Sequence, residues 1–195
     1  TLAFTSAATA ASNVGNYAIT GSGLTANNGN YTFVQAPGNA TALAITPATL
    51  TYVADPATRA YGAANPAFTG TVTGFVAPDT QASATTGTLA FTSTATAASN
   101  AGSYAITGSG LTANNGNYTF VQAVGNATAL TITPAIPTAS ITNSPVVYNG
   151  SVQTAAVACS GGGTATLVSG TGTGTNAGSY PTTVDCAASL NYAAA

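Results

Sequence analysis

The chain has 195 residues and a formal net charge of −2, and its charged side chains are Arg59, Asp55, Asp79 and Asp185. Because it contains no His, Lys or Glu, it lacks the usual general acids and bases and the groups that activate Ser or Thr nucleophiles. A single Arg cannot neutralise a nucleic-acid backbone, and two Cys without His cannot complete a zinc site. The composition therefore predicts no enzyme, no cofactor, no metal site and no nucleic-acid partner.

A long repeat organises the chain. Residues 1–48 recur as residues 88–135, with 43 of the 48 aligned positions identical and an offset of 87 residues. A shorter, diverged copy follows Pro134, since Asn176–Tyr180 repeats the pattern of Asn100–Tyr104. We therefore expect three tandem modules, whose neighbours in the chain are their partners. Pro near each short junction favours a semi-rigid string of modules.

The predicted domain boundaries follow from this period. Residues 1–47 are the C-terminal part of a truncated repeat, and residues 48–134 form one complete repeat. Residues 135–195 form a diverged repeat that we expect to be truncated at its C-terminus. No stretch approaches the roughly 20 consecutive apolar residues of a membrane span, so no transmembrane segment is predicted.

Large side chains occur in pairs two residues apart along the complete repeat. In chain order the pairs are Leu50/Tyr52, Leu89/Phe91, Tyr104/Ile106, Tyr118/Phe120 and Leu130/Ile132. A period of two places both members of a pair on one face of a strand. Turn-forming residues separate the pairs, and we interpret Asn28-Gly29 and Asn115-Gly116 as hairpin turns.

About seven strands in a repeat of this length are typical of an immunoglobulin-like β-sandwich. The predicted fold class is all-β, with tandem immunoglobulin-like sandwich modules arranged as a string. A β-solenoid would repeat every 20–30 residues or so, and the repeat contains no such period. Disorder is disfavoured because bulky side chains recur in every candidate strand.

Three copies of an Asn-x-Gly-x-Tyr pattern end at Tyr17, Tyr104 and Tyr180. In immunoglobulin-type domains, a Tyr at the start of a strand turns back to hydrogen-bond the backbone upstream and forms a tyrosine corner. The alternative is a turn followed by a core Tyr. Both interpretations direct the ring inward.

Cys159 and Cys186 lie in the third copy, 27 residues apart, and each follows a Val by two positions. This phase directs both sulfur atoms to the core face. We predict a disulfide between two strands, whereas the alternative is a pair of buried free thiols.

Residues 49–75 and 87–120 resemble the MBG domain of the YGX type, whose naming tripeptide corresponds to Tyr61-Gly62-Ala63. The third copy, with Tyr148-Asn149-Gly150, resembles a related bacterial immunoglobulin-like repeat and departs from the pattern after Gly150. The resemblance implies repeats of large bacterial surface or secreted proteins, often adhesins similar to filamentous haemagglutinin. It implies an extracellular or cell-surface location and no catalytic residues.

The remaining candidate sites are weak. The three Asp side chains are potential Ca²⁺ ligands, but isolated Asp residues before Pro or Thr more often form turns. Five Asn-x-Ser/Thr glycosylation sequons begin at Asn30, Asn39, Asn117, Asn126 and Asn149. Chance explains most of them in a chain this rich in Asn and Thr. Tyr17, Tyr31, Tyr104 and Tyr118 are possible carbohydrate contacts, but their strand positions favour core packing.

Two functions remain open at this point. A stalk or spacer predicts interchangeable, near-identical modules, as the first two copies are. A ligand-binding adhesive module predicts a distinctive surface, for which the diverged third copy is the candidate.

Overall fold

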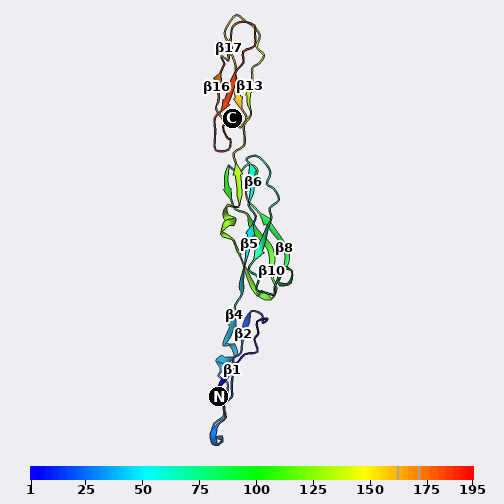
Figure 1. Ribbon diagram of the computed structural model, residues 1–195, viewed down its shortest axis with the longest axis vertical. Helices are drawn as coiled ribbons and strands as arrows, with labels where there is room; N and C mark the ends of the chain where they lie inside the picture. Colours follow the sequence, from blue (N-terminus) through cyan, green and yellow to red (C-terminus); the bar gives the residue numbers. More distant parts are fainter. Residues whose placement is uncertain (162, 171) are drawn as a thin grey trace. The chain divides into compact units, whose positions relative to one another are not determined.

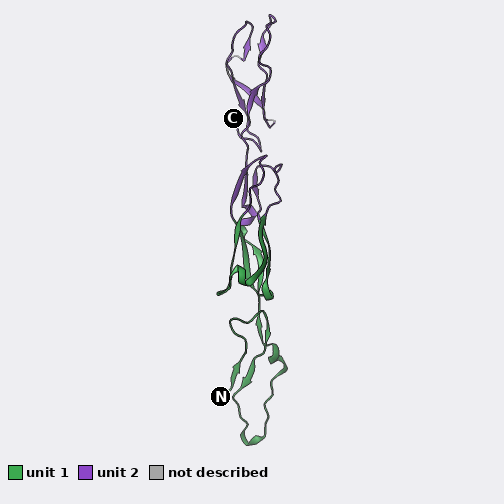
Figure 2. Ribbon diagram, turned by 90° about the vertical axis from the view of Figure 1, so that its right-hand side faces the viewer, with its two compact units in different colours: residues 1–54, 69–91, 107–124 green, residues 55–68, 92–106, 125–195 purple. Residues whose placement is uncertain are grey.

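The computed structural model describes residues 1–161, 163–170 and 172–195. It confirms an all-β chain (Figure 1), in which many short strands form several small sheets. Two compact units interleave along the sequence (Figure 2). Unit 1 comprises residues 1–54, 69–91 and 107–124, and unit 2 comprises residues 55–68, 92–106 and 125–195. Among the described residues, no helix has the length and apolar character needed to cross a membrane.

Unit 1 contains one three-stranded sheet and three strand pairs. In the three-stranded sheet, β5 (Ala48–Ala54) runs parallel to β11 (Tyr118–Gln122) and antiparallel to β7 (Gly70–Thr73). The pairs are β1 (Ala3–Thr5) with β3 (Thr20–Ser22), β2 (Gly15–Tyr17) with β4 (Leu43–Ile45), and β8 (Thr85–Thr92) with β10 (Thr107–Ala113). The short helices are η1 (Asn27–Gly29), η2 (Pro37–Thr41), η3 (Asn114–Gly116) and the single turn α1 (Gln81–Ala84).

The core of unit 1 gathers on the three-stranded sheet. Leu50, Ala84 and Tyr118 are buried together, and partly buried hydrophobic side chains such as Phe75 pack against them. The ring of Tyr52 stacks on Phe120 with centroids 5.2 Å apart. These residues come from positions separated by two along their strands, so the alternation in the sequence predicts this core face correctly.

The described part of unit 2 contains one three-stranded sheet and three strand pairs. In the sheet, β12 (Leu130–Thr133) lies between β6 (Ala57–Ala60), to which it is parallel, and β9 (Gly102–Tyr104), to which it is antiparallel. The pairs are β13 (Ala139–Ile141) with β15 (Val157–Cys159), β14 (Gln153–Thr154) with β17 (Thr173–Gly174), and β16 (Ala165–Ser169) with β18 (Thr183–Cys186). Helix η4 (Val124–Thr128) precedes β12. Ile106, Leu130 and Ile132 are fully or almost fully buried.

The first copy buries far less of the same sequence than the second. Tyr118 is 6% exposed, whereas its equivalent Tyr31 is 75% exposed. Strand β11 carries Tyr118 and pairs with β5, while residues 31–36 form no strand. Among the described residues, no strand pairs with residues 31–36, so Tyr31 lacks the cover that β5 gives to Tyr118. The prediction that Tyr31 packs in a core is therefore wrong.

The Asn-Gly turns form, but not as hairpins. Asn115 and Gly116 both have positive φ, at 55° and 68°, and the pair at Asn28-Gly29 repeats this geometry. Positive φ at both central residues is the conformation that Asn-Gly favours. However, β10 pairs with β8 and β11 pairs with β5. The turn before Tyr118 thus connects strands that have other partners, which corrects the hairpin prediction.

Candidate functional site

All three Asn-x-Gly-x-Tyr turns have the same internal hydrogen bond. In each copy the Tyr hydroxyl donates to the backbone carbonyl oxygen of the Asn four residues upstream. The pairs are Tyr17 with Asn13 at 2.6 Å, Tyr104 with Asn100 at 2.9 Å, and Tyr180 with Asn176 at 2.9 Å. The hydrogen bond holds the turn closed and leaves the Asn side chain available for other contacts.

The Asn13 side chain contacts the following repeat inside unit 1. Nδ2 of Asn117 donates to Oδ1 of Asn13 at 2.9 Å, and the backbone N–H of Val14 donates to Oδ1 of Asn117 at 2.9 Å. The backbone carbonyl of Asn117 also accepts from the N–H of Ala48 at 3.0 Å. Asn117 therefore binds both the turn of the preceding repeat and the first residue after Pro47.

The same contacts recur inside unit 2 between the second and third copies. Nδ2 of Asn191 donates to Oδ1 of Asn100 at 2.9 Å, and the N–H of Ala101 donates to Oδ1 of Asn191 at 2.8 Å. The carbonyl of Asn191 accepts from the N–H of Ala135 at 2.9 Å. Although the third copy has diverged, it keeps the Asn that makes this joint.

We call these two sets of contacts the asparagine joints. Each joint combines the first Asn of an Asn-x-Gly-x-Tyr turn with the Asn of the Asn-Tyr pair in the next repeat. The sequence analysis noted the three Asn-x-Gly-x-Tyr turns but predicted no contact for their Asn side chains, and it did not single out the Asn-Tyr pair. Both patterns recur in all three copies, and this recurrence is the sequence signal for the joints.

The second joint also includes an aromatic contact. The ring of Tyr61, from the Tyr-Gly-Ala tripeptide, meets the ring of Tyr192 with centroids 5.6 Å apart at 73°. An edge-to-face pair at this distance is favourable beyond its buried area. Tyr192 follows Asn191 directly, so the Asn-Tyr pair of one repeat contacts two parts of the preceding one.

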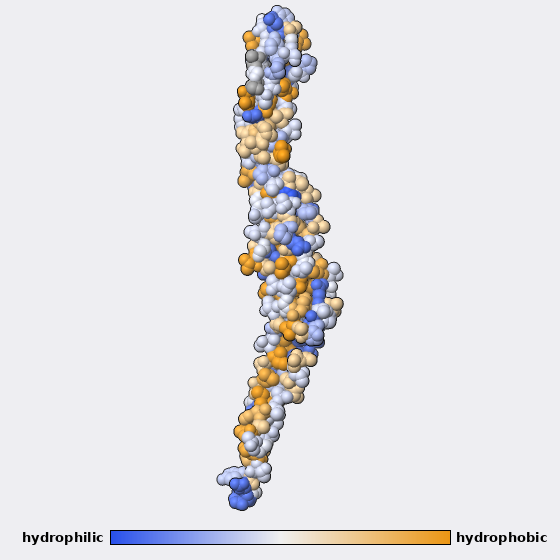
Figure 3. Space-filling view, in the orientation of Figure 1, coloured by the Kyte–Doolittle hydropathy of each residue, from blue (hydrophilic) through white to orange (hydrophobic). Residues whose placement is uncertain are grey.

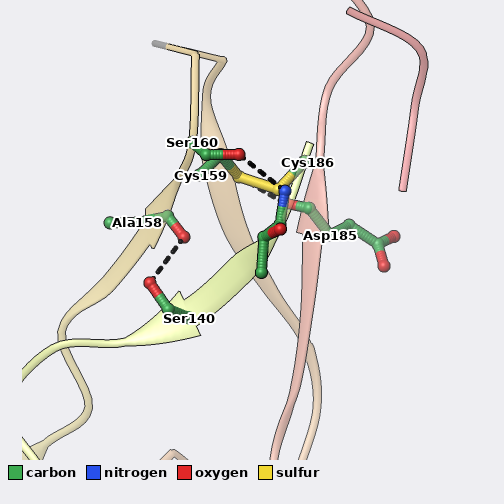
Figure 4. The surroundings of a disulfide bond; sticks show 7 residues. Ser140, Ala158, Cys159, Ser160, Asp185 and Cys186 are labelled. Carbon is green, nitrogen blue, oxygen red and sulfur yellow. Dashed lines mark hydrogen bonds between the residues drawn. A yellow bond between two sulfur atoms is a disulfide. The ribbon is translucent and has the colours of Figure 1, made fainter. Parts of the chain in front are cut away.

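Cys159 and Cys186 form a disulfide, with their Cα atoms 5.8 Å apart (Figure 4). Cys159 ends β15 and Cys186 ends β18, so the disulfide links two separate strand pairs. Cys186 is buried. The hydroxyl of Ser140 donates to the carbonyl of Ala158 beside it, which adds to the link between β13 and β15. The arrangement stabilises the third repeat.

Asp79 has a structural partner. The hydroxyl of Tyr118 donates to Oδ2 of Asp79 at 2.7 Å and accepts from the N–H of Val76 at 3.1 Å. Burial, together with the hydrogen bond to Asp79, raises the pKa of Tyr118 above its ordinary value. Within the described ranges, no three His, Cys, Asp or Glu side chains gather into a group that could bind a metal ion.

Arg59 is the one basic side chain in the sequence, and it is only 6% exposed. Its Nε donates to Oδ1 of Asn65 at 2.7 Å, and its other nitrogens donate to the carbonyls of Ala60 and Thr96. Nδ2 of Asn65 donates in turn to the carbonyl of Ala95 at 2.7 Å. These acceptors are neutral oxygens of the protein itself. The guanidinium therefore links β6 to the segments that contain Asn65 and Thr96 within unit 2, and this is a structural role. The sequence analysis did not anticipate this role.

Two clefts lie within single units. One of about 390 Å³ lies in unit 1, and Asn13, Asn117 and Tyr118 are among the residues that line it. The other, of about 400 Å³, lies in the third copy, and its lining includes Tyr148, Asn176 and Tyr180. Apolar side chains reach the surface of both units (Figure 3). The first cleft lies at an asparagine joint, and the second contains the corresponding Asn of the last turn.

Comparison with known proteins agrees with the repeat analysis. The profile of the MBG domain (YGX type) matches residues 1–41 and 50–131, which together make up more than half of the chain. The MBG domain is a repeat domain of surface proteins. No curated protein and no solved structure matches the sequence.

Proposed function

We propose that this chain, which belongs to the MBG domain (YGX type) family, is a non-catalytic stalk or spacer of a large bacterial cell-surface or secreted adhesin-like protein. The observation that carries the proposal is that the asparagine joint recurs between successive copies with the same donors and acceptors. A spacer requires this property, because every added copy must attach to the previous one in the same way.

The near-identity of the first two copies supports the same function. Their 43 identities in 48 positions include the first Asn, the Gly and the Tyr of the turn and both residues of the Asn-Tyr pair. Duplication of a ligand site adds nothing to a protein that needs the site once, whereas duplication of a spacer lengthens it each time. The scarcity of titratable groups supports a non-catalytic role. The disulfide is compatible with an extracellular location, where such bonds persist.

Insertion of one repeat tests the spacer. A second copy of residues 48–134 is added directly after Pro134 in the full chain, and small-angle X-ray scattering measures the maximum dimension before and after. We expect an increase of about 40 Å, from compact-domain scaling and strand rise. An unchanged maximum dimension would contradict a spacer, because the added copy would then fold back on the others.

The alternative is an adhesive module in the third repeat, and the cleft lined by Tyr148 and Tyr180 is the observation that favours it. This cleft suits an uncharged ligand such as a neutral oligosaccharide. Titration of the purified chain with a panel of neutral oligosaccharides, followed by Tyr fluorescence, separates the two functions. Saturable binding that Tyr148→Ala removes would support the adhesive module, whereas a spacer predicts no response.

A further inference from the structure

We infer that Tyr148 and Asn176 of the third repeat form a joint surface whose partner is the Asn-Tyr segment of another repeat of this kind. The inference rests on the proposed spacer function and specifies how a further copy is recognised. It extends the two asparagine joints to a surface that this chain leaves exposed.

The second joint shows what such a surface consists of. Repeat two contributes the amide of Asn100 and the ring of Tyr61, and repeat three contributes Asn191 and Tyr192. Asn191 also accepts the N–H of Ala101, the residue directly after Asn100. One side of the joint is therefore an Asn-Ala turn plus a Tyr ring, and the other side is an Asn-Tyr pair.

The third repeat carries the first side of this joint. Tyr148 lies 87 residues after Tyr61, which is the period of the chain, and it is followed by Asn149-Gly150. Asn176 is followed by Ala177, as Asn100 is by Ala101, and its carbonyl accepts the Tyr180 hydroxyl as in the other two turns. The third turn is therefore closed in the same way.

These residues lie together and face solvent. Tyr148, Asn176 and Ala177 all line the cleft of about 400 Å³ in the third repeat. Tyr148 is 65% exposed, whereas Tyr61 is half-buried where it meets Tyr192. At the second joint, an Asn-Tyr pair covers a Tyr ring, an Asn amide and the following Ala, and the third repeat presents the same three residue types at its cleft.

The matching Asn-Tyr pair is present at Asn30-Tyr31, within a stretch identical in sequence to that around Asn117-Tyr118. Asn30 and Tyr31 are exposed. A second copy of this chain therefore carries the segment that the third repeat recognises, and two copies in solution provide both sides of a joint. None of the residues on either side is charged, so recognition depends on amide hydrogen bonds and ring packing.

Thiol trapping between two full-length chains tests the inference. One chain carries Thr32→Cys, directly after Tyr31, and the other carries Thr175→Cys, directly before Asn176. Both positions are exposed, and both variants keep the amides of the proposed joint. Each chain is prepared with its native disulfide already formed, and a short bismaleimide is then added to the mixture. We expect a cross-linked heterodimer at several times the yield given by a control in which Thr25→Cys, an exposed position in the same segment, replaces Thr32→Cys.

A further substitution tests the aromatic part. Adding Tyr148→Ala to the chain with Thr175→Cys leaves the thiol in place and should lower the yield to that of the control. Equal yields from Thr32→Cys and Thr25→Cys would overturn the inference, since they would show random collision. A yield that Tyr148→Ala leaves unchanged would also overturn it. The insertion experiment by scattering does not depend on either result, so failure of the spacer is distinguished from failure of this joint surface.

Discussion

Substitution of Asn117 by Ala measures the strength of the first asparagine joint. The change removes the donor to Asn13 and the acceptor of the Val14 N–H, which are the two hydrogen bonds of that side chain. A hydrogen bond between neutral groups contributes about 1 kcal/mol net, and less where solvent competes. We therefore expect the joint to lose about 1–2 kcal/mol, which corresponds to a factor of about 5–30 in the equilibrium constant for its opening.

Hydrogen exchange of single backbone amides provides the assay. The Val14 N–H donates to Asn117 Oδ1, so its exchange rate, followed by NMR on the labelled full chain, reports opening of the joint directly. Asn117→Ala should accelerate it by the factor above and leave the amides of β5 unchanged. Asn191→Ala should do the same at Ala101, which donates to Asn191.

The chain supplies its own matched control. Asn30 lies in the same local sequence as Asn117, but its side chain is exposed. Asn30→Ala should leave the exchange of Val14 and Ala101 unchanged. If Asn117→Ala left Val14 as protected as in the wild type, the asparagine joint would not hold the repeats together, and the reasoning would fail.

Three other substitutions test the supports of the repeats. Tyr118→Phe should lower the free energy of unfolding by about 1–2 kcal/mol, because Asp79 and the Val76 N–H lose their partner. Burial raises the pKa of Tyr118 in the folded state, so the Tyr of the unfolded chain ionises first as the pH rises above about 10. The free energy of unfolding of the wild type should therefore fall above that pH. Urea titrations at increasing pH should show a smaller fall for Tyr118→Phe. Replacing both Cys159 and Cys186 by Ala should destabilise the third repeat by up to about 3.5 kcal/mol, the chain-entropy value for a 27-residue loop, with no change in Val14 exchange. Arg59→Ala should lower the free energy of unfolding by about 3 kcal/mol because three buried contacts are lost, and a melting temperature equal to that of the wild type would contradict its structural role.

The sequence predicted the β content and the inward faces of the strands because both depend on local alternation. All ten members of the five large pairs are buried or half-buried in the complete repeat, as the period of two requires. Turn conformations were also predictable from the chain alone. Asn28 and Asn115 adopt φ of 60° and 55° in two different surroundings, since an Asn-Gly pair favours this conformation whatever its neighbours are.

Strand pairing was less predictable, because it depends on residues far away in the chain. Tyr31 and Tyr118 share their local sequence, yet only Tyr118 lies in a strand, since only β11 has β5 beside it. The parallel register of β5 and β11 joins segments about 70 residues apart, which no local pattern encodes. The burial of Arg59 was missed for the same reason, because Asn65 and Thr96 approach it only after folding.

The chemistry of the joints fits the composition of the chain. With 2% charged residues, the protein cannot link its repeats by networks of ion pairs, and exposed ion pairs weaken as salt rises. An asparagine amide is neutral, does not titrate near physiological pH, and acts as donor and acceptor at once. Asn117 uses both functions, donating to Asn13 and accepting from Val14. Joints made of such contacts neither titrate near physiological pH nor depend on ion pairs that salt screens, which is a property that the proposed spacer requires.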